Sequence, residues 1–152
     1  MKDDLNITGI VTLRRYDSFH KLIDTVTIRN MIVNGGLTFF AGKILNLTDA
    51  EITHIALGDS DQSVAKTNTA LFSEKMRSLS RYMILGEQSG EMLIEAVFLG
   101  NESPTFTINE IGLFDSNDTL LARTTLSSSD AFMKTPQETI SVTWRILLGG
   151  EL

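Results

Sequence analysis

The sequence is poor in the residues that carry most protein chemistry. Its 152 residues include no cysteine, which excludes disulfides, thiolate metal ligands and thiol catalysis. Only two histidines occur, His20 and His54, and we expect both to be structural. No apolar run approaches the ~18 residues of a membrane span. The opening residues, MKDDLNITGI, lack the apolar segment of a signal peptide. We therefore expect no membrane partner.

The charge pattern argues against nucleic-acid binding. The formal net charge is −6, and the lysines and arginines are scattered along the chain. A nucleic-acid interface needs clustered basic residues that displace counterions from phosphates. The length and the 42% hydrophobic content predict one domain over residues 1–152. We expect no nucleic-acid partner.

Catalytic and metal-binding motifs are also absent. The sequence contains no P-loop, no H-E-x-x-H and no G-x-S-x-G. Asp59, Asp61 and Ser63 alternate as in a calcium loop. However, Val64 stands where the turn needs glycine, and Ala70 stands where a bidentate glutamate belongs. The sequence thus predicts no enzyme, no catalytic residue, no cofactor and no metal, with residues 59–69 forming a polar surface loop.

Strand patterns dominate what is present. In TISVTWRILL (139–148), Trp144 shares one face with four aliphatic residues, while polar residues occupy the other face. EMLIEAVFL (91–99) alternates in the same way and points Phe98 inward, and Phe106 begins another apolar run. Short polar turns join such segments, which favours antiparallel pairing. We predict a mainly β protein, an antiparallel β-sandwich of seven to nine strands with Trp144, Phe98 and Phe106 in its core.

One segment has helical spacing instead. Residues 30–46 predict a helix after the second strand, with Asn30 as N-cap and Asn46 near its end. Three glycines, Gly35, Gly36 and Gly42, weaken this helix or interrupt it near Asn34. They also allow close approach of another backbone, which makes them possible oligomer contacts. A second short helix is predicted within residues 67–77.

Glu110 interrupts the apolar run of TINEIGLFDSNDTLLARTTL (107–126). The alternation of apolar and polar residues shifts by one position near Asn109, which indicates either a bulge or a strand buried on both faces. A buried carboxylate needs a partner. We predict a structural ion pair of Glu110 with Arg123 and Arg145. Gly112 leaves room for a large side chain, for which Trp144 is the candidate.

Four segments resemble a family of tailed-bacteriophage virion proteins over roughly residues 28–148. They are IRNMIVNGGLTFFAGKIL, ITHIALGDSDQSVAKTNTALFSEKMR, INEIGLFDSNDTLLARTTL and KTPQETISVTWRILL. The family hairpin I-x-E-x-G-L-F-D is contained in the third segment. The resemblance implies a non-enzymatic virion structural protein of a tail fibre, tail tip or adaptor, made in the host bacterial cytoplasm. It further implies a symmetric oligomer, commonly a homotrimer, with other phage virion proteins as partners.

Two other functions remain open from the sequence. A capsid decoration protein on the head surface fits the same resemblance. A host-receptor or glycan-binding module is a different class, and it usually presents exposed aromatic rings. The single tryptophan, Trp144, is predicted to lie inside.

Overall fold

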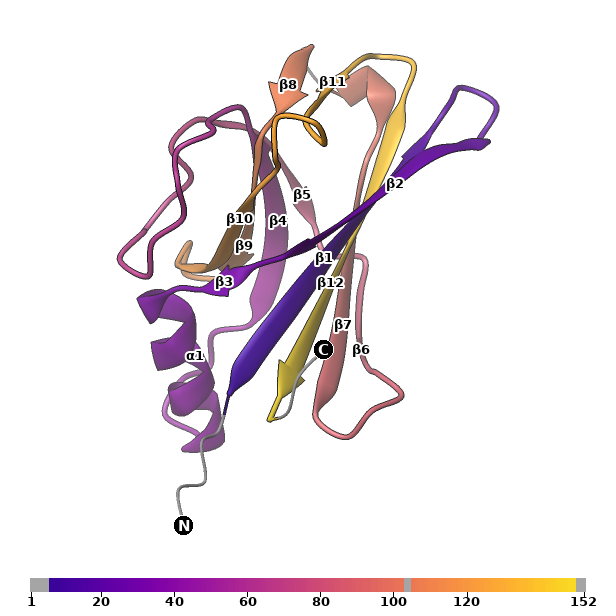
Figure 1. Ribbon diagram of the computed structural model, residues 1–152. Coiled ribbons are helices and arrows are strands. Elements are labelled where there is room, and N and C mark those ends of the chain that lie inside the picture. The colour runs from indigo at the N-terminus through magenta and orange to yellow at the C-terminus, as the bar shows by residue number, and fades with distance from the viewer. Residues whose placement is uncertain (1–5, 103–104, 150–152) are drawn as a thin grey trace.

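The computed structural model describes residues 6–102 and 105–149 of the chain, and most of them lie in β-strands. The first sheet, called sheet A here, has five antiparallel strands in the order β2-β1-β12-β7-β6. Their bounds are β2 Leu22–Arg29, β1 Ile7–Tyr16, β12 Thr139–Leu148, β7 Glu91–Phe98 and β6 Tyr82–Leu85. β1 and β2 extend past the other strands as a long hairpin (Figure 1).

The second sheet, sheet B, also has five antiparallel strands, in the order β3-β10-β9-β4-β5. These are β3 Met31–Ile32, β10 Leu120–Thr125, β9 Glu110–Asp115, β4 Ile52–Gly58 and β5 Glu74–Leu79. A two-stranded sheet pairs β11 Phe132–Lys134 with β8 Phe106–Ile108, and a 3-10 turn covers Gly100–Glu102. The mainly β, antiparallel prediction is confirmed. The predicted number of seven to nine strands was too low, because strands of two or three residues, such as β3, β8 and β11, are too short to show a periodic pattern.

Sheets A and B enclose a single large apolar cluster. The inward residues of β12, from Ile140 to Ile146, are fully buried, while Thr143 on the opposite face is half-buried. Trp144, Phe98 and Phe106 all belong to this cluster. The alternation of apolar and polar residues in the sequence therefore matches the pleat of β12, in which successive side chains point to opposite faces.

β9 is buried on both faces along its whole length. Ile111 and Leu113 enter the large cluster, whereas Phe114 enters a smaller one on the other side of sheet B. The phase shift near Asn109 is therefore the point where the chain leaves β8 and enters sheet B. Gly112 lies against Leu71 and Phe114, so the prediction that Trp144 presses on it was wrong.

The helix α1 spans Asn34–Ile44 and follows β3. Its N-cap is Val33 and not Asn30, because residues 31–32 first pair with β10. It ends where Asn46 adopts a positive φ of 54°. The amide of Asn46 donates to the Lys43 carbonyl, and that of Leu47 donates to the Gly42 carbonyl. This is the Schellman arrangement, in which a left-handed residue satisfies the last helical carbonyls.

Gly35 and Gly36 bring α1 against β10. A Cβ built on Gly36 would lie 2.0 Å from the Leu121 carbonyl oxygen, and one on Gly35 would lie 2.6 Å from that of Leu120. These glycines therefore allow a close backbone contact, but within the chain itself. Gly42 faces Thr48. Whether these glycines also contact another copy of the chain stays a prediction.

The second predicted helix, within residues 67–77, is wrong. Glu74–Leu79 forms β5 at the edge of sheet B, and the residues before it belong to a long loop. Pairing with β4 draws Glu74–Leu79 into sheet B, and Leu71 packs beside Phe114. Within the described ranges, no helix is long and apolar enough to cross a membrane.

Replacing Trp144 tests the core directly. Trp144→Ala should lower the free energy of unfolding by about 3–5 kcal/mol, because it leaves a large cavity between the sheets. Urea denaturation measures the change. Thr143→Ala, on the opposite face of β12, is the control and should change stability by about 0.5 kcal/mol or less. A loss below about 1 kcal/mol for Trp144→Ala would contradict its place in the core.

The helix glycines provide a second test. Gly36→Ala forces a methyl group against the Leu121 carbonyl and should destabilise the protein by about 1–3 kcal/mol. Gly42→Ala meets only the Thr48 methyl at 3.1 Å, while alanine gains up to about 1 kcal/mol of helix propensity. Denaturation midpoints should therefore separate the two variants. Equal midpoints would contradict the close α1–β10 contact.

Candidate functional site

A buried ion pair joins β9 and β10. The Arg123 guanidinium approaches Glu110 Oε2 through Nε at 3.0 Å and through Nη2 at 2.9 Å. Both side chains are fully buried. Ion burial is costly unless the remaining polar atoms also find partners. The surroundings of the pair therefore decide whether the arrangement is stable.

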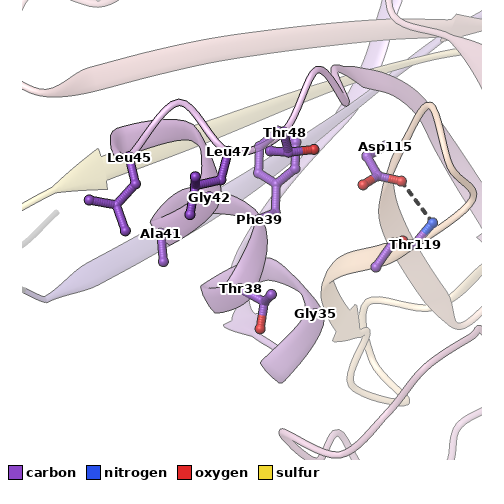
Figure 2. Close-up of a pocket in the computed structure, with 10 residues that line it drawn as sticks. All are labelled: Gly35, Thr38, Phe39, Ala41, Gly42, Leu45, Leu47, Thr48, Asp115 and Thr119. Atoms are coloured by element: carbon purple, nitrogen blue, oxygen red, sulfur yellow. Dashed lines mark hydrogen bonds between the residues drawn. The ribbon is translucent and has the colours of Figure 1, made fainter.

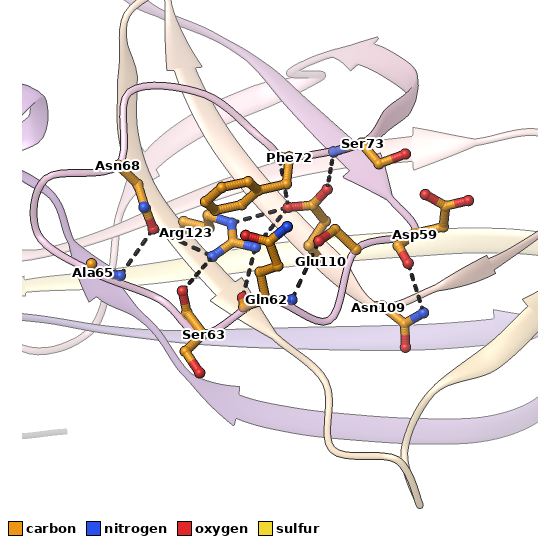
Figure 3. A network of polar contacts seen from close by, with 11 residues as sticks. Asp59, Gln62, Ser63, Ala65, Asn68, Phe72, Ser73, Asn109, Glu110 and Arg123 are labelled. Carbon is orange, nitrogen blue, oxygen red and sulfur yellow. Dashed lines mark hydrogen bonds and ion pairs between the residues drawn. The ribbon is translucent and has the colours of Figure 1, made fainter.

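Those partners come mainly from the main chain of the loop at residues 59–73, here called the polar loop. Glu110 accepts hydrogen bonds from the amides of Ser73, at 2.7 Å, and Phe72, at 3.1 Å. Arg123 Nη2 donates to the Gln62 carbonyl at 2.9 Å (Figure 3). Nη1 of Arg123 donates to the Ser63 carbonyl and to Asn68 Oδ1, both at 3.3 Å.

An aromatic ring and a glycine complete the surroundings of the ion pair. We call Glu110, Arg123 and their hydrogen-bond partners in the polar loop the clamp. The Arg123 guanidinium lies 4.7 Å from the centre of the Phe72 ring, close enough for a cation–π contact. Gly58 ends β4 directly beneath the pair. A Cβ there would lie 2.4 Å from the Ser73 carbonyl oxygen and 2.5 Å from Glu110 Oε1. Only glycine leaves room for both groups.

The structure brings Glu110 and Arg123 together but separates Arg145 from them. Arg145 lies on sheet A, where its Nε donates to Glu91 Oε1 at 2.9 Å. That hydrogen bond, followed by one from the Gln88 amide, lowers the pKa of Glu91 below its ordinary value. The second predicted partner of Glu110 is thus corrected.

The acidic residues of the polar loop have local partners. Asp59 Oδ2 lies 3.5 Å from Lys75 Nζ. A side-chain hydrogen bond from Ser73 is the main cause that lowers the pKa of Asp59, and Lys75 adds to it. Over residues 6–102 and 105–149, no group of three or more histidine, cysteine, aspartate or glutamate residues could hold a metal.

The two histidines lie apart from the clamp. His54 is half-buried on β4, where Nδ1 is 2.8 Å from Thr53 Oγ1. His20 has a positive φ of 60° in the turn between β1 and β2. Sequence patterns could not reveal the loop carbonyls and amides that hold Glu110 and Arg123, since every residue carries such groups.

A groove lies between α1 and the turn from Asp115 to Thr119. Small residues form most of its floor, and Asp115 braces the turn by accepting a hydrogen bond from the Thr119 amide at 2.8 Å (Figure 2). The groove has a volume of about 430 Å³. Leu45 and Leu47 line it and are both exposed.

A second groove, of about 480 Å³, lies at the end of the sheets where β12 finishes and β7 begins. Its lining is mainly apolar and comprises Phe39, Phe40, Lys43, Ile44, Glu51, Ile52, Met92 and Leu148. Phe39 lines both grooves. We call these two grooves, together with the exposed residues Ile44, Leu45 and Leu47, the basal surface.

Removal of Glu110 tests the clamp. Glu110→Ala leaves Arg123 buried without its carboxylate and should cost about 3–5 kcal/mol of unfolding free energy. Glu74→Ala, which breaks an exposed contact with Arg77, is the control and should cost about 1 kcal/mol or less. Chemical denaturation measures both. Equal losses would indicate that Glu110 is solvated and does not hold the polar loop.

The sequence matches a known protein family over most of its length. The family model of the phage tail-collar fibre protein, N-terminal, matches residues 26–149, which is most of the chain. No curated protein and no solved structure matches it. The family match confirms the resemblance to tailed-phage proteins. The chain belongs to the phage tail-collar fibre protein N-terminal family, and its role is structural, in a bacteriophage tail fibre.

Proposed function

We propose that this chain is a non-enzymatic attachment module of the tail fibre, folded as one domain over residues 1–152. In this proposal it assembles as a symmetric homotrimer and joins the fibre to neighbouring virion proteins. It is made in the host bacterial cytoplasm and acts in the virion. Family membership supports the structural role, and the basal surface supports attachment.

The basal surface is the observation that carries the proposal. Ile44, Leu45 and Leu47 are 65%, 66% and 77% exposed, and they border two grooves with largely apolar linings. Contiguous apolar surface of this kind typically marks a site of protein association. Gly35 and Gly36 allow α1 to pack closely against β10, so contacts within the chain position α1 beside this surface.

The clamp supports a non-catalytic role. Both carboxylate oxygens of Glu110 accept hydrogen bonds from main-chain amides, and one of them also contacts Arg123. The Arg123 guanidinium contacts that carboxylate and donates hydrogen bonds to loop carbonyls. These fully buried charges are therefore committed to holding the polar loop, and a substrate would have to displace those contacts to reach them.

Two other functions are less well supported. A capsid decoration protein would use similar surfaces, but the family match is to a tail-fibre protein. A glycan-binding module would offer flat aromatic rings to sugars. Trp144 and Phe98 are fully buried, and the half-exposed Phe72 ring stacks over Arg123. Phe19 is 88% exposed, but it lies in the turn between β1 and β2 and lines neither groove. The tail-fibre attachment module is therefore the better supported function.

The test combines solution mass with particle assembly. Light scattering should give the mass of three chains for the purified protein. The double substitution Ile44→Glu with Leu47→Glu places charges on the basal surface. It should keep the trimer mass but abolish incorporation into tail particles in a complementation assay, because attachment through apolar grooves is lost.

Phe19→Glu is the matched control. Phe19 is 88% exposed at the tip of the β1–β2 hairpin, at the opposite end of β1 from the basal surface. This variant should incorporate normally. A monomeric mass of the unmodified protein would contradict the trimer, and normal incorporation of the basal variant would contradict attachment through α1.

A further inference from the structure

Asp115 is a buried carboxylate on the wall of the first basal groove, which lies between α1 and the turn from Asp115 to Thr119. The residue is only 5% exposed. One oxygen, Oδ1, accepts hydrogen bonds from the amides of Asn117, at 2.9 Å, and Thr119, at 2.8 Å. The other oxygen, Oδ2, makes no hydrogen bond and no ion pair within residues 6–102 and 105–149. A carboxylate oxygen held in a largely buried residue usually has a partner.

Oδ2 is open to the groove. It is not one of the fully enclosed polar atoms that lack a partner, so part of its surface remains accessible. Figure 2 shows this oxygen on the side of Asp115 that faces Phe39 and Thr48, away from the oxygen that binds the Thr119 amide. The groove therefore combines a largely apolar lining with one carboxylate oxygen that the described residues leave unpaired.

The charges that border this groove favour a cation. Residues 45–52 and 115–119 both contribute to its lining, and together they contain four acidic residues and no basic residue. Asp118 is paired with Arg77, so three of the four acidic side chains lack a basic partner in the described structure. Complementary charge across an interface favours the correct partner and excludes others.

No basic side chain of the described residues lines the first groove. Lys43 is the single basic residue of α1. Its Nζ lies 3.5 Å from the Thr48 carbonyl oxygen and 5.9 Å from the centre of the Phe39 ring. Lys43 lines the second basal groove instead. A cation for Asp115 therefore has to come from another molecule.

The hydrogen bonds of Asp115 distinguish between the two strongly cationic side chains of proteins. A guanidinium binds a carboxylate best as a fork that uses both oxygens. Oδ1 already accepts two amide hydrogens, so Oδ2 alone is left for an incoming donor. An ammonium is a compact point charge, for which one free oxygen is sufficient. Thr38, Thr48 and Thr119 also line the groove, and threonine hydroxyls can accept the other ammonium hydrogens.

The rest of the lining suits an aliphatic stem. Phe39, Ala41, Leu45 and Leu47 provide apolar surface around a volume of about 430 Å³. A lysine side chain buries its methylene groups along such surface while its charged end stays with a polar group. The groove therefore offers a wall for the stem and a carboxylate oxygen for the ammonium.

We propose that the first basal groove binds a lysine side chain of a neighbouring virion protein, with the ammonium at Asp115 Oδ2. This inference rests on the proposed function, since it names the chemical group that the basal surface recognises. The apolar lining supplies contact area, and the carboxylate oxygen selects a lysine over an uncharged side chain.

Butylammonium is the probe because it reproduces the lysine side chain. Titration of the purified protein should give saturable shifts of the Leu47 and Thr119 amide signals in NMR spectra, at millimolar concentration. Butylammonium should bind at least about tenfold more tightly than the uncharged 1-butanol. It should also bind more tightly than propylguanidinium, which reproduces arginine. Absence of saturable shifts, equal binding of 1-butanol, or tighter binding of propylguanidinium would each overturn the lysine site.

Asp115→Asn is the matched variant. The asparagine carbonyl can keep both hydrogen bonds of the turn, while its uncharged amide group replaces Oδ2. The affinity for butylammonium should fall at least about tenfold. Asp118→Asn is the control, because it removes the same charge from the same turn at a positive φ of 63°, which asparagine tolerates. Equal losses in the two variants would overturn the contact with Asp115. The probe series needs only the unmodified protein, so it decides the question without a folded variant.

Particle assembly separates this inference from the proposed function. Asp115→Asn should lower incorporation into tail particles, whereas Asp118→Asn should incorporate normally. Normal incorporation of Asp115→Asn, together with loss for Ile44→Glu with Leu47→Glu, overturns the lysine contact and leaves the proposed function standing. Normal incorporation of both variants overturns both.

Discussion

The buried pair of Glu110 and Arg123 is the constraint on which one side of this protein depends. Two full charges lie inside sheet B, and main-chain groups of the polar loop, with the side chain of Asn68, complete their hydrogen bonds. Exposing or breaking such a pair costs several kcal/mol, a large part of the 5–15 kcal/mol that stabilises a typical domain. The polar loop is therefore a fixed cover of sheet B, although its composition is that of a solvated loop.

This cover makes the two sheets unequal. On sheet B, the polar loop bonds to Glu110 and Arg123, and α1 packs through Gly36 against β10. β9 is consequently buried on both faces. Sheet A receives no such support from the clamp, and its outer face carries Thr25 and Thr27 in exposed positions. The outer face of sheet A and the basal surface therefore stay exposed.

The sequence predicted the elements whose pattern is local. The alternation around Trp144 located β12 and its inward face because the pleat has a period of two. Glu110 stood out because a carboxylate in an apolar run needs a partner, and Arg123 lies on the strand that returns from the same hairpin. The positive φ of Asn46 likewise follows from a residue type that tolerates this conformation.

The errors came where distant parts of the chain decide the structure. Alternation on β12 shows that Arg145 points away from Trp144, but not that it lies in a different sheet from Glu110. The prediction of a helix within residues 67–77 was wrong because pairing with β4 makes Glu74–Leu79 a strand. Gly35 and Gly36 signalled a close backbone contact, but glycine does not specify whether that backbone belongs to the same chain.

The basal surface and the edges of sheet A point in different directions. The second basal groove lies where β12 ends and β7 begins, that is, at one end of the strands. The free edges lie along the sides of sheet A. In the proposed homotrimer, an axis that follows the strands would place three basal surfaces at the same end. Binding of one basal surface to a partner would then raise the effective concentration of the other two, so that weak individual contacts produce firm attachment.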